Sequence, residues 1–166
     1  MGKKEPNKEE CMIAIDSIAP EFCLPNQDDV EICLRDLKGR WIVLYFYPKN
    51  NTPGCTTQAC EFTMAVPDFT ILNAVVLGIS ADTTEKHRNF IEKKDLGITL
   101  LSNESTDVIQ KYGVWQLKKN YAKEYMGIVR TTFIINPSGI IKAIFSKVRV
   151  KDHVAKVKEE LTILQT

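Results

Sequence analysis

Two stretches of the chain are apolar at nearly every position, and both predict buried strands. Residues 41–47 read W-I-V-L-Y-F-Y, and residues 74–80 read A-V-V-L-G-I-S. Runs rich in β-branched and aromatic side chains are typical of strands that are covered on both faces in an α/β sheet. We therefore place these two runs at the centre of a sheet.

Shorter apolar segments predict smaller strands on either side of this centre. A short strand from about residue 19, a turn at 25–29 and a returning strand at 30–34 together predict an N-terminal hairpin. A turn at 136–139 joins the two strands of a second predicted hairpin. The strands expected in the second half of the chain lie at residues 98–101, 131–135 and 140–146.

Segments with helical periodicity lie between these strands. We expect Pro67 to kink or end the first helix, because proline removes a backbone donor. Asp82 and Glu85 have the spacing of a capping box at the start of the second helix. The last helix carries apolar residues at spacings of three and four, which is typical of an amphipathic helix. The four predicted helices cover residues 53–65, about 83–94, 105–112 and 151–164.

The order β-α-β-α-β-β-α predicts an α/β protein with a thioredoxin-like fold. Its central mixed β-sheet should be flanked by helices on both faces, with the N-terminal β-hairpin as an addition. The length of 166 residues suits one domain with a real hydrophobic core. We expect residues 1–15 to form a flexible extension and residues 16–166 to form the domain.

Composition narrows the range of partners. The chain has 22 basic and 21 acidic residues, so its net charge of +1 gives no electrostatic reason to expect nucleic acid or a membrane surface as a partner. No apolar run approaches the roughly 20 residues of a membrane span. The first ten residues do not have the pattern of a secretory signal. The cytoplasm is the expected location.

The chain contains five cysteines, an odd number that does not suggest a disulfide framework. In a reducing compartment we expect Cys23 and Cys33 to be small hydrophobic side chains within strands. Cys11 lies in the expected extension and suggests an incidental exposed thiol. The remaining two cysteines are Cys55 and Cys60.

Cys55 falls where a helix is predicted to start. Thr52 suits the N-cap, Pro53 suits the first helical position, and Gly54 allows close approach of the backbone. Unpaired backbone N–H groups and the helix dipole favour a thiolate in the first turn. The helix terminus alone contributes roughly 0.3–1 kcal/mol, so a cation should stand nearby. Arg130, an isolated arginine at the mouth of an apolar strand, is the candidate.

The spacing of Cys55 and Cys60 carries a mechanical consequence. Five residues of α-helix rise about 7.5 Å and leave the two side chains about 140° apart. A disulfide needs Cα atoms roughly 4.4–6.8 Å apart. If the two cysteines bond, the helix that carries them must at least partly unwind.

The sequence does not suggest a metal site. It contains no C-x-x-C pair, and neither histidine stands at ligand spacing from the cysteines. His87 and His153 lie on predicted helices among charged residues, and we expect both to be solvated. No metal ligand is therefore assigned.

At this point a family resemblance becomes visible. Pro48, Thr52 and Cys55 form the pattern P-x-x-x-T-x-x-C, which resembles the active-site signature of the peroxiredoxins. The longer string F-Y-P-K-N-N-T-P-G-C-T-T-Q-A-C-E-F resembles the branch named bacterioferritin comigratory protein, or PrxQ. The segments 112–118 and 125–139 also resemble that branch. The similarity spans roughly residues 17–165.

The resemblance implies a thiol peroxidase that reduces hydrogen peroxide and organic hydroperoxides without metal, haem or flavin. Cys55 would attack the terminal peroxide oxygen and become a sulfenic acid, the first step of thiol oxidation. Thr52 and Arg130 would hold the peroxide. Cys60 would resolve the sulfenic acid as an intramolecular disulfide, and thioredoxin or a similar dithiol would then reduce it.

The same resemblance assigns Pro48 and Pro53, together with Gly54, to the substrate pocket. The branch is often monomeric, so we expect a monomer or at most a weak dimer. Antioxidant defence and cell redox homeostasis would be the role of such an enzyme.

Other interpretations stay open from the sequence. A purely structural explanation is available for both helper residues. Thr52 would then serve only as a helix cap, and Arg130 would serve only as a surface ion-pair residue. Tyr45 and Trp115 are better explained as packing residues than as catalytic ones.

Two other functions are compatible with the same fold. A dithiol–disulfide oxidoreductase normally needs C-x-x-C at the helix start, which is absent here, and a peroxide sensor would use the same cysteine to regulate a partner. Cys11, Cys23 or Cys33 in place of Cys60 is a further alternative for the resolving residue.

Overall fold

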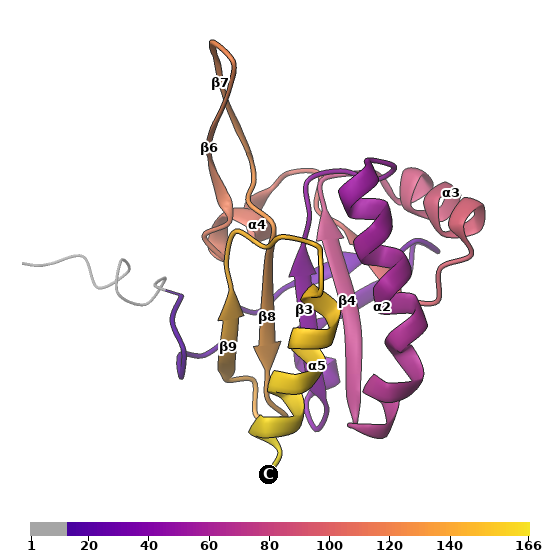
Figure 1. Cartoon of the computed structure of the whole chain (residues 1–166), viewed down its shortest axis with the longest axis vertical. Coiled ribbons are helices and arrows are strands. Elements are labelled where there is room, and N and C mark those ends of the chain that lie inside the picture. Colours follow the sequence, from indigo (N-terminus) through magenta and orange to yellow (C-terminus); the bar gives the residue numbers. More distant parts are fainter. Residues whose placement is uncertain (1–12) are drawn as a thin grey trace, which may run out of the picture.

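The computed structural model describes residues 13–166, with a five-stranded sheet at the centre (Figure 1). The strand order is β5-β4-β3-β8-β9. β4 runs parallel to β3 and β5, whereas β8 is antiparallel to β3 and β9. The predicted mixed sheet is confirmed. Its strands are β3 (Trp41–Phe46), β4 (Ala74–Ser80), β5 (Thr99–Ser102), β8 (Thr131–Ile135) and β9 (Ile141–Phe145).

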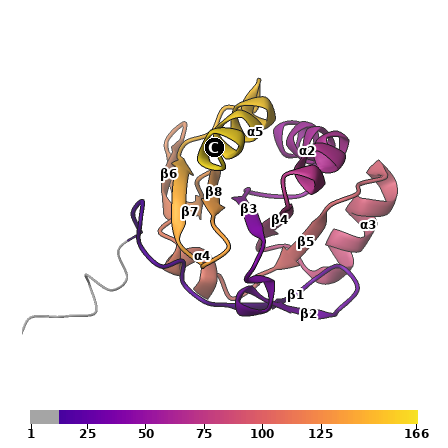
Figure 2. The same ribbon diagram turned by 90° about the horizontal axis from the view of Figure 1, so that it is seen from below.

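The sheet separates two hydrophobic cores. Val43 of β3 belongs to the core on the side of α2 (Pro53–Ile71) and α5 (His153–Leu164), and Leu44 belongs to the core on the other side. The two helices lie next to each other over the same face (Figure 2). Because successive strand side chains point to opposite faces, a strand between two cores is apolar at every position.

The second face is covered by a short helix and by the N-terminal hairpin. Phe22 and Leu24 of the hairpin share their core with residues of α4. A backbone bridge between Asn26 and Leu101 ties the hairpin to β5. The predicted hairpin addition is confirmed. The elements concerned are β1 (Cys23–Pro25), β2 (Glu31–Cys33), the 3-10 turn η1 (Leu34–Leu37) and α4 (Asp107–Lys111).

A further hairpin, at residues 115–128, was not predicted. β6 (Trp115–Asn120) and β7 (Lys123–Ile128) pair antiparallel and project from the body of the domain (Figure 1). Most of their residues are exposed, so the segment lacks the apolar run or clean alternation by which strands are recognised. β7 leads directly to Arg130 and β8.

The predicted end of the first helix and the predicted cap of the second helix were wrong. α2 continues through Pro67 to Ile71, and Phe69 beyond the proline is buried in the core, so packing offsets the lost backbone bond. α3 (Thr84–Lys94) is capped by Thr83, whose hydroxyl oxygen accepts from the Lys86 backbone N–H at 3.1 Å. Asp82 is engaged elsewhere.

The other predicted boundaries differ from the observed ones by a few residues, as is usual at frayed element ends. Within residues 13–166, no helix is both long and apolar enough to cross a membrane. The predicted extension at residues 1–15 falls almost entirely outside the described part of the chain, as does Cys11. Ile13, at the start of the described part, packs against the core.

Candidate active site

Cys55 lies in the first turn of α2, immediately after the loop that follows β3. Thr52 is the N-cap residue and Pro53 follows at the start of the helix. The Thr52 side chain makes no capping bond; its hydroxyl donates to the Lys49 carbonyl oxygen at 3.1 Å. The Cys55 side chain is only 1% exposed. The sequence-predicted helix start is confirmed, and it brings the sulfur to a nearly closed position.

The loop from 48 to 52 begins with Pro48, two residues after the end of β3. Pro48 is half-buried, and Pro53 is exposed. The structure therefore places the two prolines on either side of the turn that leads to Cys55.

Arg130 is the cation beside Cys55. It precedes β8, which pairs with β3, and this pairing carries the guanidinium to the start of α2. Arg130 Nη2 donates to Cys55 Sγ at 3.3 Å. The sulfur therefore has a positively charged hydrogen-bond donor in direct contact. Tertiary structure thus joins two residues that are 75 positions apart in the sequence.

Gly54 makes room for this contact. A Cβ atom at this position would lie 3.2 Å from Arg130 Nη2 and 3.7 Å from a methyl group of Val150. The first of these distances is tighter than ordinary van der Waals contact. Glycine therefore lets the guanidinium lie directly over the start of the helix.

Gln58 is a site residue that the sequence analysis missed. Its side chain is fully buried, and its Oε1 accepts from Arg130 Nη1 at 2.6 Å. Residues three apart on a helix lie on the same face, so Gln58 stands beside Cys55. The signal available in the sequence was an amide side chain three residues after Cys55, on the same face of the predicted helix. Gln58 fixes the plane of the guanidinium that faces the sulfur.

Tyr45 closes the site from the sheet. Its ring stacks on Phe62 of α2 with centroids 4.7 Å apart. Burial raises the pKa of Tyr45 well above its usual range, and the nearby charge of Cys55 raises it further. The phenol is therefore neutral, and its buried hydroxyl has no hydrogen-bond partner within the described residues. The packing role expected for Tyr45 is observed, with an unused donor beside the cysteine.

Cys60 follows Cys55 on the same helix and is half-buried. Both cysteines are free, and α2 is continuous from Pro53 to Ile71. The structure therefore shows the arrangement with an intact helix. Unwinding before the two sulfurs bond remains a prediction.

The loop before Thr52 is held by a buried polar network. Tyr47 donates from its hydroxyl to Asn50 Oδ1 at 2.6 Å, and the Asn50 amide nitrogen lies 3.0 Å from His87 Nδ1. The Asn50 backbone N–H donates to Asp82 Oδ2 at 2.9 Å. His87 Nε2 lies 3.0 Å from the Leu101 carbonyl oxygen. His87 thus donates through Nε2 and accepts through Nδ1.

The expectation that both histidines are solvated was wrong. His87 is fully buried, and burial lowers its pKa. His153 is 4% exposed, its Nε2 lies 2.8 Å from Thr132 Oγ1, and burial lowers its pKa to about 4. Both stand on the inward face of their helices, which charged neighbours in the sequence concealed.

The expectation for Cys23 and Cys33 was also wrong. They form a disulfide with an S–S distance of 2.03 Å. The antiparallel register of β1 and β2 places them directly opposite each other. The sequence predicts that the two residues lie on the two strands of one hairpin, but only the register brings their side chains together. In this state neither has a free thiol with which to resolve Cys55.

Within residues 13–166, one group of three or more potential metal-ligating side chains lies close together: Cys23, Glu31 and Cys33. The two sulfurs of this group are joined to each other. They are therefore not available as thiolate ligands in this state.

Comparisons with known proteins identify the family. The model of the AhpC/TSA family matches residues 15–144. The chain belongs to the AhpC/TSA family. It is 46% identical over 149 residues to peroxiredoxin Bcp of Bacillus subtilis, a match that covers 90% of this chain and 95% of the relative. A putative peroxiredoxin bcp of Helicobacter pylori is 43% identical over 149 residues, with 90% and 98% covered.

Solved structures agree with these relatives. The bacterioferritin comigratory protein of Xanthomonas campestris superposes with a TM-score of 0.84 at 32% identity, covering 87% of this chain and 92% of that one. A cysteine-to-serine mutant of PrxQ from Xylella fastidiosa gives a TM-score of 0.85 at 31% identity, covering 92% and 99%. The chain is thus a peroxiredoxin with a thioredoxin-like fold, and a thiol peroxidase. Its family implies a peroxide substrate and a thioredoxin-type reductant.

Proposed function

We propose that Cys55 is the residue that reduces the hydroperoxide. The observation that carries this assignment is the 3.3 Å contact from Arg130 Nη2 to Cys55 Sγ in the first turn of a helix. The thiolate attacks the terminal oxygen, the O–O bond breaks, and the departing oxygen takes a proton to leave as water or an alcohol. Cys55 becomes a sulfenic acid.

Positive groups around Cys55 support this step. The free N–H groups of the helix start and the Arg130 guanidinium both face the place where negative charge moves from sulfur to oxygen. Thr52 adds a hydroxyl at the N-cap, and Pro48 and Pro53 shield the entrance. Because the sulfur is nearly covered, a small hydroperoxide suits the site as it stands.

We infer that Cys60 resolves the sulfenic acid. Condensation of Cys55–SOH with the Cys60 thiol gives a disulfide and releases water, which protects Cys55 from irreversible oxidation. The two side chains point away from each other on an intact helix, so the first turns of α2 must unwind. The disulfide is then exposed to a dithiol such as thioredoxin, which restores both thiols.

Two cysteine variants test this cycle. Cys55→Ser should abolish peroxide reduction, whereas Cys60→Ser should consume about one equivalent of peroxide and then stop. Mass mapping of the wild type after one equivalent of peroxide should show a Cys55–Cys60 bond. Peroxide reduction that survives in Cys55→Ser would refute the assignment.

A second candidate follows from the disulfide that the structure contains. Under this alternative, Cys23 and Cys33 are the pair that cycles with peroxide, and the Arg35 guanidinium lies 3.4 Å from Cys23 Sγ. The pair has only the start of the four-residue 3-10 turn η1, at Cys33, where Cys55 has the start of the long helix α2, and Arg35 is exposed rather than buried. Replacing both residues by alanine should leave turnover intact. Loss of turnover in that double variant would favour the alternative.

We propose that residues 16–166 act as one domain, as a monomer and in the cytoplasm. An intramolecular pair on one helix needs no second subunit to complete the cycle. Light scattering should give the mass of one chain in both redox states. Sustained turnover with thioredoxin, rather than stoichiometric oxidation, would distinguish the peroxidase from a peroxide sensor.

A further inference from the structure

The Cys23–Cys33 disulfide lies apart from the peroxidase site. Its hairpin packs through Phe22 and Leu24 on one face of the central sheet, while Cys55 belongs to the core on the opposite face. The sheet therefore stands between the two pairs of cysteines. The free cysteines of residues 13–166, Cys55 and Cys60, belong to the opposite side of the sheet, so chemistry at Cys23 and Cys33 needs a thiol from outside the described residues.

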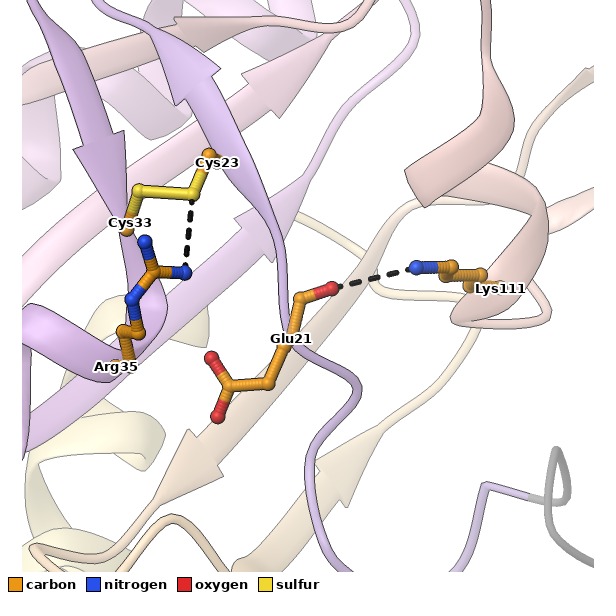
Figure 3. The surroundings of a disulfide bond; sticks show 5 residues. All are labelled: Glu21, Cys23, Cys33, Arg35 and Lys111. Carbon is orange, nitrogen blue, oxygen red and sulfur yellow. Dashed lines mark hydrogen bonds between the residues drawn. A yellow bond between two sulfur atoms is a disulfide. The ribbon is translucent and has the colours of Figure 1, made fainter.

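The two sulfurs differ in access. Cys23 is half-buried, whereas Cys33 is 5% exposed. Arg35 Nη1 donates to Cys23 Sγ at 3.4 Å, and Figure 3 shows its guanidinium directed at this sulfur. A cation beside the more accessible sulfur attracts an incoming thiolate and stabilises a thiolate formed there.

The hairpin has anchors besides the disulfide. The Leu34 backbone N–H donates to the Phe22 carbonyl oxygen at 3.0 Å, beside the cysteines. Lys111 Nζ lies 3.4 Å from the Glu21 carbonyl oxygen, which ties the start of the hairpin to α4 (Figure 3). At the far end, Gln27 Oε1 accepts from the Leu100 backbone N–H at 3.2 Å. We expect these contacts to hold the hairpin in place when the S–S bond opens.

We propose that Cys23 and Cys33 form a second thiol–disulfide exchange site, which an external dithiol reduces while the domain stays folded. A thiolate of the dithiol attacks Cys23 Sγ, the S–S bond breaks, and Cys33 Sγ leaves with the electron pair and takes a proton. Cys23 Sγ is now bonded to the first sulfur of the dithiol in a mixed disulfide. The second thiolate of the dithiol attacks this first sulfur, closes the oxidised dithiol and releases Cys23 as a thiolate beside Arg35. The dithiol loses two electrons, and the cysteine pair gains them.

Disulfides that form in a reducing compartment are usually of this exchangeable kind. The reverse reaction with an external disulfide such as oxidised glutathione restores the bond. The pair thus reports the ratio of thiols to disulfides around the protein, while Cys55 responds to peroxide.

The test uses a variant that retains only this pair: Cys11→Ser, Cys55→Ser and Cys60→Ser combined. The variant is reduced with dithiothreitol in native buffer, freed of the reductant and treated with a maleimide. We expect two labels per chain, and we expect the far-UV circular dichroism spectrum of the reduced protein to be unchanged. Oxidised glutathione should then remove both labelling sites. This variant cannot reduce peroxide by the proposed cycle, so its behaviour is independent of that proposal.

The contribution of Arg35 is tested in the same background. Arg35→Gln should slow the reduction several-fold, and Arg40→Gln, another exposed arginine, should not. As a check on folding, peptide mapping of the wild type should show the same bond and the same sensitivity to dithiothreitol. Labelling that requires urea, or two free thiols at Cys23 and Cys33 in the air-oxidised wild type, would overturn the proposal.

Discussion

The two pairs of cysteines show how little sequence spacing says about the distance between thiols. Cys55 and Cys60 are five positions apart, yet an intact helix keeps their side chains on different faces. Cys23 and Cys33 are ten positions apart, yet strand register places them opposite each other and bonded. The near pair is held apart for chemistry that needs a free thiol. The distant pair is held together.

The cations beside the two pairs also differ. Arg130 reaches Cys55 from another part of the chain and is fixed by the buried side chain of Gln58. Arg35 is exposed and only two residues beyond Cys33. Charge interactions are stronger and less screened where water is excluded. The comparison therefore predicts that loss of Arg130 lowers the rate of peroxide reduction strongly. Loss of Arg35 should lower the rate of reduction of the Cys23–Cys33 disulfide only modestly.

The largest of the graded effects should come from Arg130→Ala. Removing a group that stabilises developing charge in a closed site typically costs about 10²–10³-fold in rate. We expect such a fall in the second-order rate constant with hydrogen peroxide, measured by stopped-flow fluorescence. Arg35→Ala is the matched control and should retain the wild-type rate. Equal losses in both variants would remove the distinction between the two sites.

The next effect concerns stability. Replacing Cys23 and Cys33 by alanine opens a loop with a sequence separation of 10, and closure of a short loop is worth about 2–3 kcal/mol. Urea unfolding should show that the free energy of unfolding of the variant is lower by this amount. The wild type reduced with dithiothreitol should have the same free energy of unfolding as the variant. Peroxide turnover should persist. If dithiothreitol does not change the free energy of unfolding of the wild type, the disulfide does not contribute to stability.

A pH effect should appear on the Cys55 side of the sheet. Burial lowers the pKa of His153 to about 4, so the folded state favours the neutral ring. This stability is complete above the unfolded pKa of about 6.5 and is lost as pH falls towards 4, by on the order of 2 kcal/mol after solvent screening is allowed for. His153→Gln should flatten the dependence between pH 6.5 and 4 in urea titrations. An unchanged slope would assign the dependence to other groups.

The smallest effect is expected from Gly54→Ala. The new methyl group would lie 3.2 Å from Arg130 Nη2 and push the guanidinium by a few tenths of an ångström. Small displacements of a positioning group lower rates without abolishing them, so we expect a loss of several-fold in the peroxide rate. Gly39→Ala meets no atom within 4 Å and is far from the site, although its positive φ strains it. The Gly39→Ala variant should be less stable than the wild type, but its rate of peroxide reduction should be unchanged.

Sequence reasoning succeeded where the decisive interactions are local. The run from Trp41 to Phe46 predicted a central strand because burial on both faces requires apolar side chains throughout. It failed for the hairpin at 115–128, whose exposed residues carry no burial pattern. It also failed for His87, because charged neighbours mark the outer face of its helix and give no signal for a single inward polar side chain.

What the sequence determined by itself is the start of α2. Pro53 at the start of the helix acts within one helical turn, so its effect does not depend on the rest of the chain. Tertiary structure decided the rest of the site: the approach of Arg130, the burial of Gln58 and the pairing of Cys23 with Cys33. The first two depend on how distant segments pack against one another, and the third depends on the register of a hairpin.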